Sequence, residues 1–208
     1  CYPNSFTDDV LEVMASDPRF CRYLDMPFQH ISDPVLKKMN RKITRKEIEA
    51  TMSRVRSQLP DVAWRTTFIV GFPTETDQDF EELVDFVSEG HFQHLGIFLY
   101  SDEDNIRSSK FGDPVPLSLK EERKNRLMEI QQKISREHHQ KMVGSLQQVL
   151  VGGFSSETDL LLEGRNQYQG PEVDGVVYIN EGNATSAGFH QVEITEAHEY
   201  DLVGKILN

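Results

Sequence analysis

Two nearly continuous apolar segments, 62–70 and 92–100, constrain the fold of this chain most strongly. Their sequences, VAWRTTFIV and FQHLGIFLY, are rich in β-branched and aromatic residues, which is typical of buried strands. Between them, the apolar residues of segment 80–87 follow the spacing of an amphipathic helix. Two strands joined through a helix predict a parallel pair that is covered on both faces.

The residues before these strands continue the alternation of strand and helix. A short extended run is predicted over 22–29, and Ser32, which stands just before Asp-Pro, predicts the start of a helix. Thr44 and Glu47 have the spacing of a capping box, so another helix is expected to begin there and to continue until Pro60.

The number of strand–helix units predicts an incomplete barrel. Three such units make half of an eight-stranded barrel or less, since a complete one takes about 250 residues. An open set of three buried strands would leave apolar surface exposed. The chain also begins with Cys1 rather than methionine. We therefore expect it to be a C-terminal fragment of a longer protein.

The character of the sequence changes near residue 140. A second capping-box pattern, Ser118 and Glu121, predicts a long charged helix that runs to about His139 with a solvated face. Short β-type runs separated by turn residues follow, as in a small β-barrel. The sequence thus predicts two domains, 1–139 and 140–208. The predicted β runs are 146–151, 160–162, 176–179, 192–195 and 202–207.

Charge and composition exclude several classes of protein. A net charge of −12, from 34 acidic and 22 basic residues, argues against a general nucleic-acid clamp, because phosphates require basic surfaces. The chain has no apolar run of about 18 residues and no signal-peptide pattern, so we expect a cytoplasmic protein with no membrane span. Its two cysteines, Cys1 and Cys21, exclude a disulfide-dense scaffold.

Several motifs resemble those of the radical-SAM methylthiotransferases, and they occur in the order that the family shows. The C-terminal motifs are similar to the TRAM domain of the branch that modifies ribosomal protein S-twelve. The tRNA-modifying sister branch usually has Gln-Ser where this chain has Gln29 and His30. The matching segments are LDMPFQH (24–30), VLKKMNR (35–41), RTTFIVGFP (65–73), ETDQDF (75–80), FLYSDE (98–103), PEVDG (171–175) and EYDLVG (199–204).

The resemblance implies a fold class of α/β and then all-β: the second half of a partial TIM-like radical-SAM barrel followed by a small OB-like TRAM β-barrel. It implies a full-length enzyme that methylthiolates the β-carbon of an aspartate in ribosomal protein S-twelve. Its cofactors would be S-adenosyl-L-methionine (SAM) and two 4Fe–4S clusters. The alternatives are the tRNA isopentenyl-adenosine methylthiotransferase and a cluster-free binding protein.

Two major features and one minor one depart from the family pattern. The cysteine triplet CxxxCxxC that holds the radical-SAM cluster is absent, as is the N-terminal domain that holds the second cluster. Cys1 and Cys21 cannot supply three clustered thiolates, so we expect no metal site, no bound cofactor and no catalysis in this fragment alone. Thr74 stands where the family commonly has glycine.

Five residues at the predicted strand ends are candidates for binding the cofactor; the catalytic residues stay unknown. Ligands of such folds bind at the C-terminal ends of the strands. Arg65 shares a strand face with Ile69 and needs an acidic partner, which is a protein carboxylate or the carboxylate of SAM. The full set of candidates is Gln29, Arg65, Ile69, Gly71 and Tyr100.

The charge of the second domain predicts its partner. Residues 140–208 contain ten acidic and three basic residues. An acidic surface repels RNA and attracts basic proteins. We therefore expect the TRAM domain to bind ribosomal protein S-twelve, and tRNA to be an unlikely partner.

Overall fold

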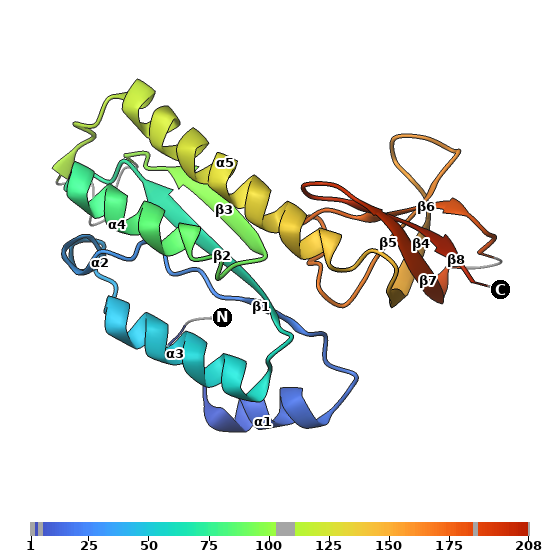
Figure 1. The fold of residues 1–208 in the computed structure, drawn as a ribbon. Helices are drawn as coiled ribbons and strands as arrows, with labels where there is room; N and C mark the ends of the chain where they lie inside the picture. The colour runs from blue at the N-terminus through green and yellow to red at the C-terminus, as the bar shows by residue number, and fades with distance from the viewer. Residues whose placement is uncertain (1–2, 4–5, 103–110, 185–186, 208) are drawn as a thin grey trace. The chain divides into compact units, whose positions relative to one another are not determined.

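The structure is a computed structural model that describes residues 3, 6–102, 111–184 and 187–207 (Figure 1). It divides into two compact units. The first unit comprises residues 1–20 and 24–131, and the second comprises residues 21–23 and 132–208. The division falls inside a long helix, whereas the sequence places the domain boundary at 139/140, which stays a prediction. No helix in the described ranges is long and apolar enough to cross a membrane.

The first unit is built on a three-stranded sheet with the order β1–β2–β3. The strands are β1 (Tyr23–Asp25), β2 (Ala63–Val70) and β3 (His94–Leu99). β2 and β3 are parallel over their whole common length, which confirms the prediction. β1 is shorter than the predicted run, but the chain returns to β2 through a parallel bridge between Gln29 and Phe68.

Five helices accompany the sheet: α1 (Asp8–Ser16), α2 (Asp33–Lys38), α3 (Arg45–Gln58), α4 (Asp77–Ser88) and α5 (Leu117–Gln140). The capping box of Thr44 and Glu47 is confirmed at the start of α3. The predicted capping box of Ser118 is wrong, because α5 begins at Leu117 and Ser118 is already helical.

Helices cover one face of the sheet. On β2, Trp64, Phe68 and Val70 are buried in a core that also contains apolar side chains of α3, α4 and α5. The alternate residues of β2 are only half-buried, and Phe98 of β3 is 58% exposed. Coverage of both faces was expected; within the described residues only one face is covered. In the barrel that the sequence predicts, the uncovered face would be the inner side.

The second unit contains a closed five-stranded barrel with the order β4–β5–β6–β8–β7 (Figure 1). The predicted all-β character is therefore confirmed, and four of the five predicted runs fall on strands. The run predicted at 160–162 is misplaced, because β5 begins only at Leu162 and Leu160 is exposed in a turn. The core contains valine, isoleucine and leucine side chains from β4, β6, β7 and β8. The strands are β4 (Leu146–Phe154), β5 (Leu162–Arg165), β6 (Val177–Glu181), β7 (Gly188–Ala197) and β8 (Leu202–Ile206).

Candidate functional site

Four of the five candidates, Gln29, Ile69, Gly71 and Tyr100, lie together at one edge of the sheet, because parallel strands bring their C-terminal ends together. Arg65 is not among them, because it lies near the start of β2, paired with the first residue of β3. Gln29 donates its backbone N–H to Thr67 and accepts the N–H of Ile69, each at 2.9 Å. The N–H of Tyr100 donates to the carbonyl of Val70, also at 2.9 Å. Backbone hydrogen bonds thus hold the segments after β1 and β3 against the end of β2.

Gln29 has an unusual backbone conformation, with a φ of 74°. Residues with a side chain rarely adopt this left-handed region, and such strain is concentrated at functional sites. The side chain of Gln29 is half-buried.

Arg65 finds its acidic partner within the protein. Its Nη1 atom donates to Oδ2 of Asp25 at 2.9 Å, and its side chain is 15% exposed. Asp25 belongs to β1, so this pair joins two neighbouring strands on the half-open face. The sequence left a protein carboxylate and the carboxylate of SAM as alternatives; the structure shows the protein carboxylate.

Gly71 is enclosed by the protein on two sides. Its backbone N–H donates to Oε2 of Glu75, and its φ is +74°. A β-carbon at this position would overlap the aliphatic part of the Lys120 side chain. Glycine is therefore required by both the turn and the close approach of α5.

Glu75 is the centre of a buried polar network that the sequence analysis did not find. Oε2 accepts the backbone N–H groups of Gly71 and Phe72. Oε1 lies 3.4 Å from Nη1 of Arg123 and 3.9 Å from Nε2 of His30, and all three side chains are almost fully buried. A buried carboxylate needs such partners to offset its lost hydration.

His30 is oriented by the backbone. Its Nδ1 atom accepts the N–H of Ser32 at 3.0 Å, which leaves the ring proton on Nε2, the atom that faces Glu75. Ser32 occupies the N-cap position of α2, but its hydroxyl donates to Asp79 of α4 instead of capping the helix.

Asp79 is a buried carboxylate with several donors. Burial raises its pKa, but hydrogen bonds from Ser32 and Thr76 outweigh this effect, and His30 contributes in the same direction as those bonds. The pKa of Asp79 is therefore below its usual range. Thr76 and Asp79 also form the capping box at the start of α4.

Lys120 binds the residue that directly follows β3. Its Nζ atom donates to the carbonyl oxygen of Tyr100 at 2.7 Å and to the carboxylate of Asp113 at 2.5 Å. Lys120 and Arg123 are both buried, so the expectation that the charges of this helix form a solvated face is wrong for these two residues. In the sequence, the only indication that these two side chains are buried is that they stand three residues apart in the helix.

Tyr100 lies in a small aromatic cluster. Its ring packs edge-on against Phe72 at 5.2 Å, and Phe72 packs against Phe111 at 6.0 Å. The buried hydroxyl of Tyr100 has no hydrogen-bond partner among the described residues. A polar atom in this state is suited to a ligand group.

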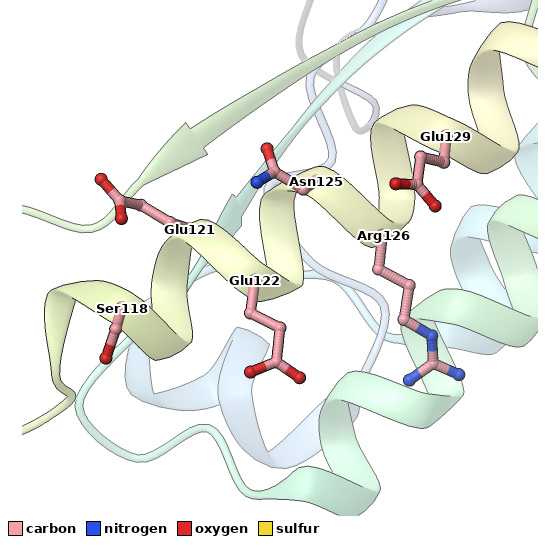
Figure 2. Close-up of a pocket in the computed structure, with 6 residues that line it drawn as sticks. All are labelled: Ser118, Glu121, Glu122, Asn125, Arg126 and Glu129. Carbon is pink, nitrogen blue, oxygen red and sulfur yellow. The ribbon is translucent and has the colours of Figure 1, made fainter.

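The exposed side of α5 carries several of the remaining charged residues of the helix. A shallow hollow of about 520 Å³ lies along it (Figure 2). Arg126, which lines the hollow, pairs with Glu81 of α4 at 2.5 Å. All its lining residues come from this one helix, so this side is the solvated face that the sequence predicts. They are Ser118, Glu121, Glu122, Asn125, Arg126 and Glu129.

Thiolates for an iron–sulfur cluster are not brought together in the described part of the chain. Cys21 is exposed and unpaired, and Cys1 lies outside the described residues. No group of three or more His, Cys, Asp or Glu side chains there is arranged to hold a metal ion. The residues present therefore do not fit such a cluster.

The class of protein follows from comparison with known families. Residues 1–87 match the radical SAM superfamily, and residues 143–207 match the TRAM domain. A solved radical SAM enzyme, coproporphyrinogen III oxidase (HemN) from Escherichia coli, shares the fold with a TM-score of 0.50 at 17% identity. The match covers 80% of this chain and 45% of that one. The chain thus combines part of a radical-SAM barrel with a TRAM barrel.

Curated relatives match the chain over its whole length. This chain is 42% identical over its whole length to the ribosomal protein uS12 methylthiotransferase RimO of Geobacter sulfurreducens, of which it covers 46%. It is 46% identical to the enzyme of the same name from Desulfotalea psychrophila, of which it covers 47%. Over its whole length the chain is therefore similar to radical-SAM methylthiotransferases that are named for ribosomal protein uS12, as its motifs predict. It spans about half the length of the curated relatives it matches.

Proposed function

We propose that this chain is part of a radical-SAM methylthiotransferase that acts on an aspartate of ribosomal protein uS12. In this reaction a methylthio group replaces a hydrogen on the β-carbon of the aspartate. The proposal rests on sequence identity. Over its whole length, the chain is 42% and 46% identical to two enzymes with that name. Such a substrate would place the reaction in the cytoplasm.

The edge of the sheet is the proposed contact to SAM. The amide of Gln29 and the hydroxyl of Tyr100 are the polar groups proposed to touch it, with Ile69 as an apolar contact. Arg65 and the N–H of Gly71 are already bound by carboxylates of the chain. We therefore propose that these two shape the site through Asp25 and Glu75 rather than through direct hydrogen bonds to the cofactor.

When bound, SAM and two 4Fe–4S clusters supply the radical, sulfur and methyl chemistry of this family. The described residues do not provide the thiolates for a cluster, so we assign no step of that chemistry to this chain. What the chain's own residues do is hold the strand ends together and shape one side of the SAM site.

The TRAM barrel is the proposed contact to the protein substrate. Residues 140–208 carry ten acidic and three basic side chains, a net charge of −7. RNA binding would require the opposite sign, because basic residues must neutralise phosphates. An acidic domain instead speeds and orients the approach of a basic protein. The negative charge of the TRAM barrel therefore favours uS12 over tRNA as its partner.

A chimaeric enzyme tests the proposal. This chain would replace the corresponding segment of the Geobacter sulfurreducens enzyme, in a bacterial host that lacks its own uS12 methylthiotransferase. We expect mass spectrometry of uS12 to show the added methylthio group on one aspartate. Unmodified uS12 together with newly methylthiolated isopentenyl-adenosine in tRNA would refute the assignment. The unsubstituted Geobacter enzyme is the control for expression and cofactor supply.

A further inference from the structure

Residues 21–23 belong to the second unit, although they lie in the sequence between two parts of the first. Tyr23 is the last of them and also the first residue of β1, whose other residues, Leu24 and Asp25, belong to the first unit. The backbone of β1 therefore passes directly from one unit into the other. Because the peptide chain is continuous, a contact that holds Tyr23 within the second unit also restrains the start of β1.

Tyr23 is held by a loop of the second unit, residues 166–176, which connects β5 to β6. Its hydroxyl donates to Oδ2 of Asp174 at 2.7 Å, across 151 positions of sequence. The same oxygen accepts the backbone N–H of Gly170 at 2.8 Å. The loop thus fixes its own carboxylate in the position that binds the phenol. A hydrogen bond to a charged group is stronger than one between neutral groups.

Gly170 leaves room for the tyrosine ring. The residue is buried, and a β-carbon at this position would lie 2.5 Å from Oη of Tyr23 and 2.9 Å from its Cζ atom. Both distances are shorter than real β-carbons show, so a larger residue would displace the ring or the loop. We call the site formed by Gly170 and Asp174 the tyrosine notch.

Buried polar side chains shape the loop around the tyrosine notch. Gln169 donates its side-chain N–H to the carbonyl of Gly175 at 2.9 Å and accepts the backbone N–H of Asn166 at 3.1 Å. Gln169 and Asn166 are both buried. Glu172 has a φ of 65°, and such strain persists only where the surrounding structure imposes it. These contacts give the loop a defined shape before Tyr23 is considered.

β1 is held by a side chain at each end. Tyr23 and Asp25 share one face of the strand, because successive side chains alternate between the faces. Asp25 binds Arg65 of β2 within the first unit, at 2.9 Å, and Tyr23 binds the tyrosine notch within the second. β1 is only three residues long, and so short a strand gains few hydrogen bonds from a sheet. Side-chain anchors therefore matter more for β1 than for longer strands.

We infer that Tyr23 is a positioning residue and that the loop 166–176 of the TRAM barrel is its docking site. By holding Tyr23, the second unit keeps β1 and the segment that follows it against β2. The N–H of Met26, in this segment, donates to the carbonyl of Arg65, and that of Gln29 donates to Thr67, each at 2.9 Å.

This role goes beyond the proposed function, which assigns the TRAM barrel to the protein substrate. The loop contains PEVDG (171–175), one of the motifs that resemble the TRAM domain. The inference gives this motif a task within the enzyme. Gln29 is a proposed contact to SAM, so the tyrosine notch also contributes to the geometry of that site. Only this last consequence rests on the proposed function.

Hydrogen exchange of the whole chain, measured residue by residue by NMR, tests the inference. Tyr23→Phe removes only the hydroxyl that binds the tyrosine notch. We expect the amides of Met26 and Gln29 to exchange roughly ten-fold faster, because the segment opens more often once its anchor is lost. The amides of β3 should keep their wild-type rates. The matched control, Tyr200→Phe, makes the same change at a tyrosine that is 41% exposed, and it should exchange like the wild type.

A change on the other side of the contact gives a second measurement. Asp174→Ala removes the acceptor, so the amides of Met26 and Gln29 should again exchange faster. In the Tyr23→Phe background the same substitution should have little further effect on these two amides, because the hydrogen bond is already lost. Gly170→Ala should also speed their exchange, since the new β-carbon takes the space of the ring.

Two results would overturn the inference. One is wild-type exchange at Met26 and Gln29 in both Tyr23→Phe and Asp174→Ala, which would show that the notch does not restrain this segment. The other is an equal acceleration of the amides of β3, which would indicate a general loss of stability. Neither result bears on the proposed function, because neither SAM nor uS12 takes part in the measurement.

Discussion

Arg123 and Glu75 form a buried ion pair, with Nη1 of the arginine 3.4 Å from Oε1 of the carboxylate. One turn further along α5, Arg126 pairs with Glu81, but these side chains are 47% and 51% exposed. Both pairs connect α5 to the region of α4. They differ mainly in burial, so together they test what burial contributes to this fold.

Arg123→Ala is expected to destabilise the first unit by about 3–5 kcal/mol, because it leaves the buried carboxylate of Glu75 without its cation. Arg126→Ala is expected to cost less than about 1 kcal/mol, as is usual for an exposed pair. Urea unfolding followed by the fluorescence of Trp64, the single tryptophan and a buried residue of β2, measures both. Equal losses of stability in the two variants would contradict the buried network.

Gly71→Ala is expected to be more harmful than Gly90→Ala. Both glycines have a φ of +74°, so alanine should cost roughly 1 kcal/mol of backbone strain at either position. At Gly90 nothing lies within 4 Å of the new β-carbon, whereas at Gly71 it overlaps Lys120. Overpacking should add about 1–3 kcal/mol at Gly71 alone.

The same urea unfolding experiment compares the two glycine variants. Lys120→Ala in the Gly71→Ala background should recover part of the lost stability, because it removes the overlapping atoms. A Gly71→Ala variant as stable as Gly90→Ala would show that α5 does not lie against the turn after β2.

The strands and helices follow from the sequence because their signals are local. The apolar run 62–70 gives β2, and the spacing of Thr44 and Glu47 gives the start of α3. The edge where Gln29 and Tyr100 meet could also be predicted, since it needs only the rule that parallel strands end together.

The buried network could not be predicted, because its members are distant in the sequence. Arg123 is 48 positions from Glu75 in the sequence, and His30 is 45 positions from it. A charged residue in a helix normally indicates a solvated face, and only tertiary contacts bury it. For the same reason the sequence could not show that the N–H of Gly71 is bound by Glu75.

Anaerobic reconstitution of this chain with iron and sulfide is expected to leave no iron–sulfur cluster on it. A cluster of this kind needs several thiolates in one place, and the chain has only Cys1 and Cys21. Iron and sulfide analysis after desalting measures the result, and Cys21→Ser is the control, expected to be the same as the wild type. Stoichiometric iron that disappears in Cys21→Ser would contradict the expectation.

Ser32→Ala should destabilise the first unit in a manner that depends on pH. At about pH 7 the loss should be roughly 1–3 kcal/mol, because the buried carboxylate of Asp79 loses a donor. The pKa of Asp79 is lowered in the folded protein. The stability that this shift contributes is therefore present above the unfolded pKa of about 3.9 and is lost as the pH falls through the lower folded value.

The difference in unfolding free energy between wild type and Ser32→Ala should thus shrink when the pH is lowered to about 3, below the unfolded pKa. Ser57→Ala is the control, because its hydroxyl donates to the backbone carbonyl of Arg54 at 2.7 Å and to no titratable group that the structure shows. The effect of Ser57→Ala should not change with pH. If the effect of Ser32→Ala is equally constant, the hydroxyl does not stabilise the charged form of Asp79. The contact between α2 and α4 would then be a neutral hydrogen bond.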